Sequence, residues 1–260
     1  MRVFTVVSLI FCVFKMSAQN SFSDFDTSGN YKPGDNSPKA KKNAFVKPLC
    51  GVAYVVAPYT VYRYADQAIK EESQEHTSAG VSGFSKLVSP LGVGNYNAAA
   101  LGTVGLFSVI VKDKKLQKTV IIWAGSLVIN DLLTNQMKIT FQRHRPSTGD
   151  NYNTFDGRSG SREHKSFISA HTSNVFTTAT VFASMYKNKK WVPFVAYGVA
   201  TLTGISRIYE NAHWASDVMA GAFIGFIIAK GMIRLYNWGS KKILILPQAG
   251  LQYSSINIAY

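Results

Sequence analysis

Cysteine is almost absent from this sequence: among its 260 residues only Cys12 and Cys50 carry a thiol. Cys12 lies in an N-terminal segment that resembles an export signal, so Cys50 would stand alone in the mature chain. A single thiol excludes an intramolecular disulfide and also excludes a metal site built from several cysteines. The chain is long enough to form one domain with its own apolar core.

Acidic residues are also scarce, because 14 Asp and Glu stand against 28 Lys and Arg and give a formal net charge of +14. Such an excess favours anionic partners: phosphate esters, anionic lipid surfaces or nucleic acid. A nucleic-acid-binding protein would show a basic stripe interleaved with aromatic residues, or a known binding module, and the sequence contains neither. We therefore expect an anionic phosphate substrate and no nucleic acid, and the sequence predicts no protein partner.

Long uninterrupted apolar runs are few, although 47% of the residues are hydrophobic. Crossing a bilayer takes roughly 20 apolar residues. Most apolar segments meet a charge earlier; the segment 172–186, for example, ends at Lys187, and the last one meets Lys230. Composition therefore leaves two alternatives open: helices that span a bilayer, and a soluble exported form.

The first 18 residues have the features of an export signal. Arg2 precedes an apolar run over 3–14, and a small residue stands at Ala18, after which we expect cleavage. The alternative is an uncleaved anchor helix. The polar segment 19–47 is rich in Gly, Pro and Ser and predicts a flexible lead-in.

Basic residues between the apolar segments predict an orientation in the envelope. The basic loops fall at one end of the expected helices, and the long polar stretch 138–171 falls at the other. Because positive loops stay on the cytoplasmic side, the polar stretch is expected on the periplasmic side of a bacterial cell envelope, in a membrane-associated or integral protein. The basic loops are 112–118, 187–190 and 230–242.

Apolar segments of helical composition occupy most of the chain from residue 48 to 238. They are dominated by Ala, Leu, Ile, Val and Gly and lack strict two-residue alternation, which favours helices over strands. We predict an all-α fold, a helical bundle of about six core helices, in which the stretch 138–171 is a long catalytic loop. The expected helices cover about 49–64, 88–111, 119–137, 172–186, 191–206 and 216–236.

The C-terminal tail 239–260 has a different pattern. Ile256, Ile258 and Tyr260 alternate with polar or small residues, and residues 247–250 resemble a turn. This pattern predicts a short C-terminal β-hairpin.

Three clusters of polar residues carry the chemistry. They are Lys138-Ile-Thr-Phe-Gln-Arg-His-Arg145-Pro146, Ser169-Ala170-His171, and Ser206-Arg207 followed by His213 and Asp217. In the third cluster His213 and Asp217 are four residues apart and share one face if a helix begins there. A carboxylate bonded to one ring nitrogen leaves the other free as a nucleophile. A packed histidine beside a helix-start carboxylate is the structural alternative.

The basic members of these clusters suit a phosphoryl group. Its transition state spreads charge over the equatorial oxygens, which fixed cations such as Lys138, Arg145 and Arg207 can stabilise. Ser169 and the backbone N–H of Ala170 come just before an apolar helical segment, where N–H groups point toward an anion. His171 on that first turn is placed to act as a general acid.

Together the three clusters resemble the signature of the type 2 phosphatidic acid phosphatase and vanadium-dependent haloperoxidase superfamily, which reads KxxxxxxRP, PSGH and SRxxxxxHxxxD. The first and third clusters match at every fixed position: Lys138, Arg145, Pro146, Ser206, Arg207, His213 and Asp217. The resemblance implies a helical phosphatase that hydrolyses a phosphomonoester or diphosphate, such as a lipid or isoprenoid phosphate, without a metal or other cofactor.

The resemblance also implies a role for each residue. His213 would form a phosphohistidine, Asp217 would orient it and His171 would protonate the leaving group. The phosphoryl oxygens would be held by Lys138, Arg145, Ser169, Ala170 and Arg207.

The second cluster departs from the family pattern, because Ile168 stands in place of Pro and Ala170 in place of Gly. Ala170 can still open a helix and offer its N–H, although its methyl group could crowd a phosphate. Asn211, before the nucleophile, can adopt a left-handed conformation as a glycine would. His144 and His164 lie outside the pattern, and we expect them to be solvated loop residues.

Two other functions remain open at this point. The same residues would bind vanadate, so a vanadate-dependent haloperoxidase is the rival enzyme, although the short chain argues against it. The altered second cluster could instead mark a catalytically silent anion-binding envelope protein.

Overall fold

The computed structural model describes residues 55–158 and 164–253, with side chains as far as residue 240. The predicted export signal and lead-in lie outside the described residues. Residues 55–64 are helical. The elements that follow are α3 (Asp66–Glu75), α4 (Ala79–Val88), the 3-10 helix η1 (Ser89–Gly92), α5 (Gly94–Ile110), α6 (Lys114–Phe141), the 3-10 helix η2 (Pro146–Thr148), α7 (Ala170–Met185), α8 (Trp191–Tyr209) and α9 (Ala215–Tyr253).

The predicted all-α bundle is confirmed, and each described apolar segment contributes a helix. α6 is longer than expected, because the Asp113 side chain caps its start by accepting from the backbone N–H groups of Lys115 and Leu116. The helix ends at Gln142, which adopts a left-handed conformation with φ 43°. Two helices were not predicted: α3, whose sequence is mostly charged and polar and lacks an apolar run, and the short helix α4.

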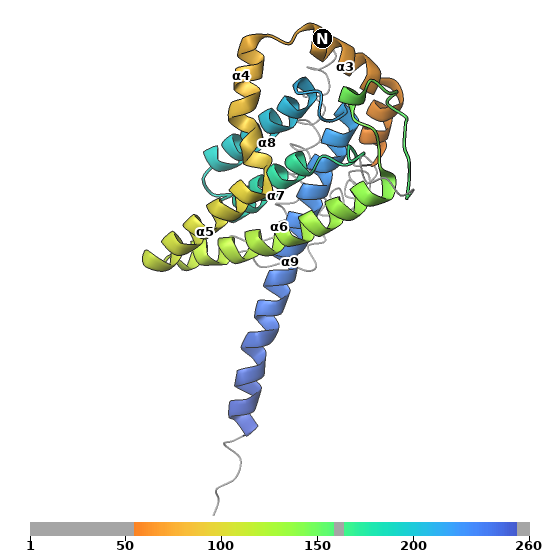
Figure 1. Ribbon diagram of the computed structural model, residues 1–260. Coiled ribbons are helices and arrows are strands. Elements are labelled where there is room, and N and C mark those ends of the chain that lie inside the picture. Colours follow the sequence, from red (N-terminus) through yellow and green to blue (C-terminus); the bar gives the residue numbers. More distant parts are fainter. Residues whose placement is uncertain (1–54, 159–163, 254–260) are drawn as a thin grey trace, which may run out of the picture.

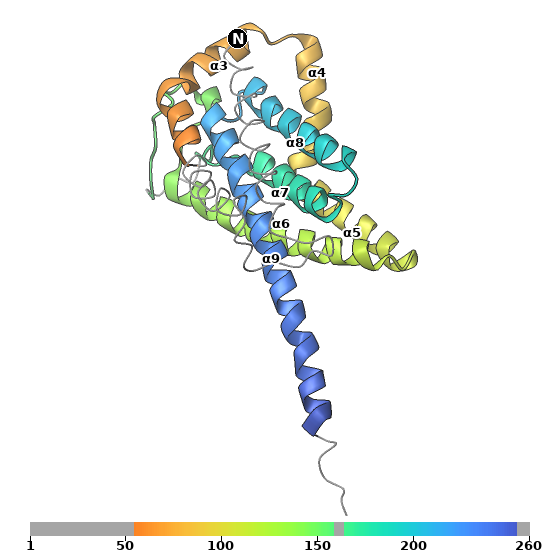
Figure 2. The same cartoon turned by 180° about the vertical axis from the view of Figure 1, so that it is seen from behind.

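The predicted C-terminal hairpin is wrong as far as residue 253. α9 continues as one helix through the expected turn at 247–250, and residues 254–260 lie outside the described part. Extending an existing helix adds one hydrogen bond per ordered residue, whereas a hairpin must be nucleated anew. The second half of α9 extends away from the other helices (Figures 1 and 2).

α7 lies at the centre of the bundle, packed against α6, α8 and α9 (Figure 1). Ser169 caps its start by accepting from the backbone N–H of Thr172. Phe176 of α7 is buried in one apolar cluster with Met219 and Phe223 of α9. The opposite side of the bundle has a second cluster around Ile122, Trp123 and Val181. A large buried area on three sides fixes the position of the α7 N-terminus.

Two glycines allow α9 to lie unusually close to α7. A Cβ atom on Gly225 would lie 2.3 Å from the carbonyl oxygen of Ser173, and one on Gly221 would lie 2.6 Å from that of Ser169. Only glycine leaves room for this backbone approach. The close contact holds the start of α7 beside the start of α9.

Buried polar side chains tie α7 to its other neighbours. Asn130 of α6 donates to the Asn174 side-chain oxygen at 2.6 Å and accepts from Ser173 at 2.5 Å. Asn174 in turn donates to the carbonyl of Gly92 in η1 at 3.3 Å. Since buried polar groups are costly unless paired, these bonds specify how α6, η1 and α7 meet.

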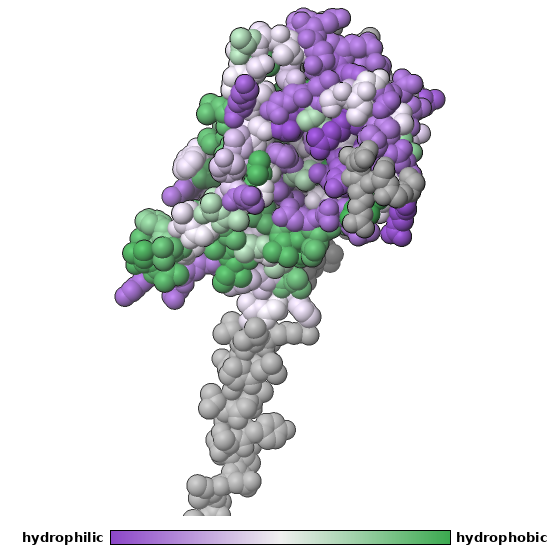
Figure 3. All heavy atoms as spheres, viewed as in Figure 1, coloured by the Kyte–Doolittle hydropathy of each residue, from purple (hydrophilic) through white to green (hydrophobic). Residues whose placement is uncertain are grey.

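Two described helices, Lys114–Phe141 and Ala215–Ser240, are long and apolar enough to cross a membrane, and a third candidate is the pair Ala79–Gly92 and Gly94–Ile110, bent by 61°. Their outer faces carry exposed apolar side chains. Figure 3 shows a hydrophobic area over the end of the body where α5 and α6 lie. Examples are Leu106, Phe107, Ile110, Ile121, Val128 and Leu132. Such a surface suits contact with lipid.

Candidate active site

His213 lies in a short non-helical segment between the end of α8 at Tyr209 and the start of α9 at Ala215. The chain reverses at Asn211, whose φ is 54°, and this confirms the left-handed conformation expected there. The backbone N–H groups of Ala212 and His213 both donate to the carbonyl of Arg207. This tight turn fixes His213 beside the end of α8, with its side chain only 2% exposed.

The hydrogen bond of the His213 ring defines its tautomer. Nδ1 lies 2.8 Å from the carbonyl oxygen of Ser166. A carbonyl can only accept, so Nδ1 carries the proton and Nε2 keeps a free lone pair. Burial, followed by the charges of Lys138, Arg145 and Arg207, holds the pKa of His213 well below its usual value. A neutral ring with a free nitrogen is the form that a nucleophile requires.

Asp217 differs in one detail from the expected arrangement, because its Oδ2 lies 3.9 Å from His213 Nδ1 and makes no hydrogen bond to the ring. The i, i+4 geometry of a helix does not apply, since α9 begins after His213. Asp217 Oδ2 instead accepts from the hydroxyl of Ser166 at 2.6 Å and from the backbone N–H of Trp214 at 3.1 Å. The carboxylate therefore holds the two segments that position the imidazole, and lies near enough to stabilise a positive charge on it.

Arg143 is a supporting residue that the sequence analysis did not single out. It is 1% exposed and donates to Asp217 Oδ1 at 2.5 Å, to Asp66 Oδ2 at 2.7 Å and to the carbonyl of Tyr152. Its place between Lys138 and Arg145 in the first cluster was a usable signal. A buried guanidinium needs such anionic partners.

Asp66 completes this support from the N-terminal end of α3. Its two carboxylate oxygens accept from the backbone N–H of Ser216 at 2.8 Å and from the Ser216 hydroxyl at 2.5 Å. Burial raises the pKa of Asp66 and Arg143 lowers it, and burial is the larger effect. No local sequence signal marks Asp66, since it lies in a polar helix, 150 residues before its hydrogen-bond partner Ser216.

His171 and Ala170 lie on the first turn of α7, as predicted for a helix that opens at Ala170. The His171 side chain is partly exposed, and burial followed by the charges of Arg207, Lys138 and Arg145 lowers its pKa to about 4. The hydroxyl of Ser169 is buried and bonded to Thr172, so in this structure it serves as the helix cap. The N-terminus of α7 therefore presents an imidazole and the positive end of a helix beside the cations.

The three predicted cations surround the two histidines. Lys138 is on the last turn of α6, Arg145 precedes η2, and Arg207 is on the last turn of α8. All three act electrostatically on both His171 and His213. The Arg207 Nη1 donates to Glu210 and to Ser89, whereas its buried Nε has no hydrogen-bond partner among the described residues. A buried donor without a partner suits the oxygen of an anion.

An apolar cavity of about 740 Å³ lies behind the loop that precedes α7. Phe167 and Ile168 of the loop form one wall, and Phe141 of α6 and Phe223 and Ile227 of α9 belong to the others. Arg143 and Ser216 also reach it. The cavity thus adjoins the residues that support the candidate nucleophile.

The structure therefore gathers the predicted residues from four separate helix ends and one loop. His213, His171 and the three cations form one electrostatically coupled group, and a carboxylate oxygen of Asp217 lies 3.9 Å from the ring of His213. Such a group can bind a tetrahedral anion and supply both a nucleophile and a proton donor.

Comparison with known proteins gives relatives that share this part of the chain. Residues 119–241 match the model of the PAP2 superfamily. A lipid A 1-phosphatase of Porphyromonas gingivalis is 35% identical over 115 residues, covering 41% of this chain and 23% of that protein. A lipid A 4'-phosphatase of the same organism is 25% identical over 140 residues, covering 50% of this chain and 58% of that protein. The chain thus spans less than two thirds of the length of these curated relatives.

Solved structures show the same fold. A transmembrane PAP2 type phosphatidylglycerolphosphate phosphatase from Bacillus subtilis has a TM-score of 0.54 and 18% identity, and the match covers 72% of this chain and 93% of that one. LpxE of Aquifex aeolicus has a TM-score of 0.53 and 22% identity, and the match covers 65% of this chain and 94% of that one.

Two described helices are long and apolar enough to cross a membrane, and this indicates a membrane protein. The family pattern inferred from the three clusters is confirmed by the match to the family model. Residues 119–241, which carry every site residue predicted from the sequence, are thus similar to the PAP2 superfamily.

Proposed function

We propose that this protein is a lipid phosphate phosphatase that forms a phosphohistidine at His213. The observation that carries the proposal is the state of the His213 ring: its Nδ1 is committed to the Ser166 carbonyl, and its Nε2 is left free beside three cations. A nucleophile held in one tautomer and facing concentrated positive charge is suited to attack a phosphate ester.

In this mechanism Nε2 of His213 attacks phosphorus, and the bond between phosphorus and the leaving oxygen breaks. Lys138, Arg145 and Arg207 stabilise the charge on the equatorial oxygens, together with N–H groups at the start of α7. His171 donates a proton to the leaving oxygen. In the second half, His171 accepts a proton from a water molecule that attacks the phosphohistidine, and orthophosphate leaves.

The low pKa of His171 fits a role that depends on substrate. With the cations unopposed, burial and positive charge keep this ring neutral at neutral pH. A phosphate dianion beside the same cations would offset their field and raise the pKa of His171. The acid would then be protonated when a substrate is bound.

We further propose that the substrate is a lipid-linked phosphate, and that the exported protein hydrolyses it on the periplasmic side of the envelope. The exposed apolar faces of α5 and α6 support access from a bilayer, and the apolar cavity behind Phe167 can accept an acyl chain. The curated relatives named lipid A 1-phosphatase and lipid A 4'-phosphatase support a phosphorylated glycolipid. Lipid A is therefore the first substrate to test.

The test is phosphate release from lipid A, an isoprenoid diphosphate, phosphatidic acid and a small soluble ester by the detergent-solubilised protein. We expect lipid phosphates to be hydrolysed without added metal, vanadate or peroxide. His213→Ala should abolish turnover, and His171→Ala should slow it by roughly 10²–10⁴-fold. His76→Ala, at an exposed histidine directly after α3, is the matched control.

Single-turnover labelling tests the intermediate directly. Labelled phosphate should appear on His213, stable to base and lost in acid. Equal activity of the wild type and His213→Ala would refute the mechanism. Activity that requires vanadate and peroxide would instead indicate the haloperoxidase, and absence of turnover on every substrate would favour the catalytically silent alternative.

A further inference from the structure

Backbone hydrogen bonds within the loop between α6 and α7 bring together three residues that the phosphatase mechanism does not use: His144, Asp156 and His164. His144 pairs with the middle of the loop, because its backbone N–H donates to the carbonyl of Thr154 at 3.1 Å. The N–H of Asp156 donates to Gln142 at 3.2 Å. The end of the loop returns through a bond from the Ser166 N–H to the carbonyl of Arg143 at 3.0 Å. This pairing places His144, Asp156 and His164 side by side.

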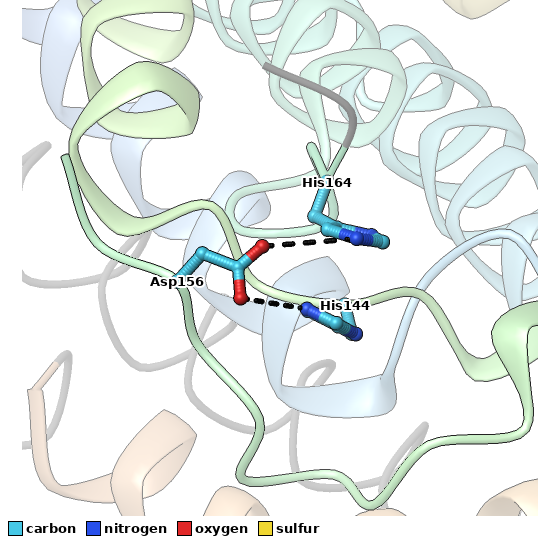
Figure 4. Close-up of side chains that lie close together, drawn as sticks. All are labelled: His144, Asp156 and His164. Atoms are coloured by element: carbon cyan, nitrogen blue, oxygen red, sulfur yellow. Dashed lines mark hydrogen bonds and ion pairs between the residues drawn. The ribbon is translucent and has the colours of Figure 1, made fainter. Parts of the chain in front are cut away.

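The side chains of these three residues converge, as Figure 4 shows. Asp156 Oδ1 lies 3.0 Å from His144 Nε2, and its Oδ2 lies 3.7 Å from His164 Nε2. The two imidazole rings are stacked, with centroids 3.5 Å apart and planes inclined by 16°. One nitrogen or oxygen atom from each residue lies within 4.8 Å of the others. His144 and His164 are thus partners and not the separate solvated side chains that we expected.

A second carboxylate determines which nitrogen of His144 is available. Asp150 Oδ2 lies 2.7 Å from His144 Nδ1, where it can only accept. In the neutral ring the proton therefore sits on Nδ1, and the lone pair of Nε2 faces the carboxylate of Asp156. Two acceptors that face each other need a positive species between them, which is either a proton or a metal ion. Histidine ligands of metals characteristically donate their other nitrogen to a carboxylate in this way.

We propose that His144, Asp156 and His164 form a binding site for a divalent transition metal ion of the zinc class. Two imidazole nitrogens and one carboxylate are a common ligand set of zinc, whereas magnesium and calcium prefer oxygen ligands alone. Their side chains are 13%, 29% and 23% exposed, so an ion can enter from solvent and keep a water molecule as a further ligand.

The ion would act on the loop and not in phosphoryl transfer. His144 adjoins Arg145, which faces the candidate phosphate site, and His164 is two residues before Ser166, which bonds His213. A metal ion shared by His144 and His164 joins the beginning of the catalytic loop to its end. The cations around His171 and His213 repel a second divalent ion from the catalytic pair.

The experiment measures zinc binding to the full-length, tag-free protein in detergent, by competition with a chromogenic chelator. Cys12→Ser and Cys50→Ser form the background, so that no thiol competes for zinc. We expect one bound equivalent, which magnesium does not displace. His164→Ala and Asp156→Asn should lose it or weaken it at least tenfold. His76→Ala is the matched control, and it should bind as the background protein does.

Each outcome decides the question. Absence of a bound equivalent in the background protein would overturn the proposal and leave the proton as the species shared by His144 and Asp156. Equal zinc affinity in the background protein and His164→Ala would overturn it as well. His164 makes no hydrogen bond with other described side chains apart from this cluster, so its variant should fold even if Asp156→Asn does not. As a second readout, zinc should raise the melting temperature of the background protein and leave that of His164→Ala unchanged.

Discussion

Asp66→Asn removes one negative charge from the buried support behind the candidate nucleophile. Asp66 is 1% exposed and accepts from Arg143 and twice from Ser216. An asparagine of the same shape has only one oxygen, and its amide group would face at least one of these donors. Arg143 would keep Asp217 as its remaining anionic partner.

The expected loss of stability follows from the burial of this network. Removing one partner of a buried ion pair costs about 3–5 kcal/mol, because the other charge is left without compensation in a site that excludes water. Here Arg143 retains a second carboxylate, so we expect the lower end of that range, about 3 kcal/mol. Glu71→Gln on the same helix is the control: within the described part of the chain its exposed carboxylate accepts only from the Gln67 amide. Exposed pairs of this kind contribute about 0–1 kcal/mol.

The assay is denaturant unfolding in detergent for the wild type, Asp66→Asn and Glu71→Gln, with phosphatase turnover measured in parallel. We expect turnover of Asp66→Asn to fall by about 10–100-fold, as is usual for residues that orient catalytic groups, while its KM changes little. Ser216→Ala should be coupled to Asp66→Asn by about 0.5–3 kcal/mol, since the two side chains share hydrogen bonds. A variant Asp66→Asn that is as stable and as active as Glu71→Gln would refute the assigned role of this network.

Two further predictions concern packing and pH. Gly225→Ala should destabilise the protein by about 1–3 kcal/mol, because the added methyl group would meet the Ser173 carbonyl. Gly231→Ala on the same helix is the control: its methyl group would meet no other atom, so the variant should be neutral or slightly stabilising. Unfolding measurements that rank the two variants equally would contradict this packing. The free energy of unfolding should also fall as the pH drops from 6.5 to about 4. In this range the unfolded chain protonates His171, whereas the folded protein keeps the ring neutral because its pKa there is about 4. Sulfate, a dianion throughout this range, should reduce the fall in melting temperature in the wild type but not in His171→Gln, and an equal effect in both would count against an anion site beside His171.

Much of the fold was predictable because the apolar segments are long and rich in helix-forming residues. The segments that became α5, α6, α7, α8 and α9 were all predicted as helices. α3 was not, since its stability comes from contacts at Ile69 and Asp66 and not from an apolar face of its own. The C-terminal hairpin was wrong as far as residue 253, where the described chain continues as a helix through the expected turn; continuing an existing helix needs no new nucleation.

The residues of the candidate site were named from the sequence, and their roles stay predictions; the hydrogen bonds among them could not be named in the same way. Spacing suggested that Asp217 bonds the ring of His213, but a non-helical turn before α9 gives that bond to the Ser166 carbonyl. Spacing could also not reveal that Arg143 joins Asp217 to Asp66, because this contact bridges segments 77 residues apart.

Short-range patterns of residue type were enough to predict the groups of the site, namely a candidate nucleophile, a candidate acid and three cations, together with most of the helices. Which atoms face one another depends on the packing of the helices, because hydrogen bonds and ion pairs act over only a few ångströms. The tautomer of His213, the buried support from α3 and the meeting of His144 with His164 all depend on segments that pack together although they are distant in the chain. The types of side chain in a site can therefore be predicted from short sequence patterns, whereas their tautomers and their hydrogen-bond partners depend on the fold.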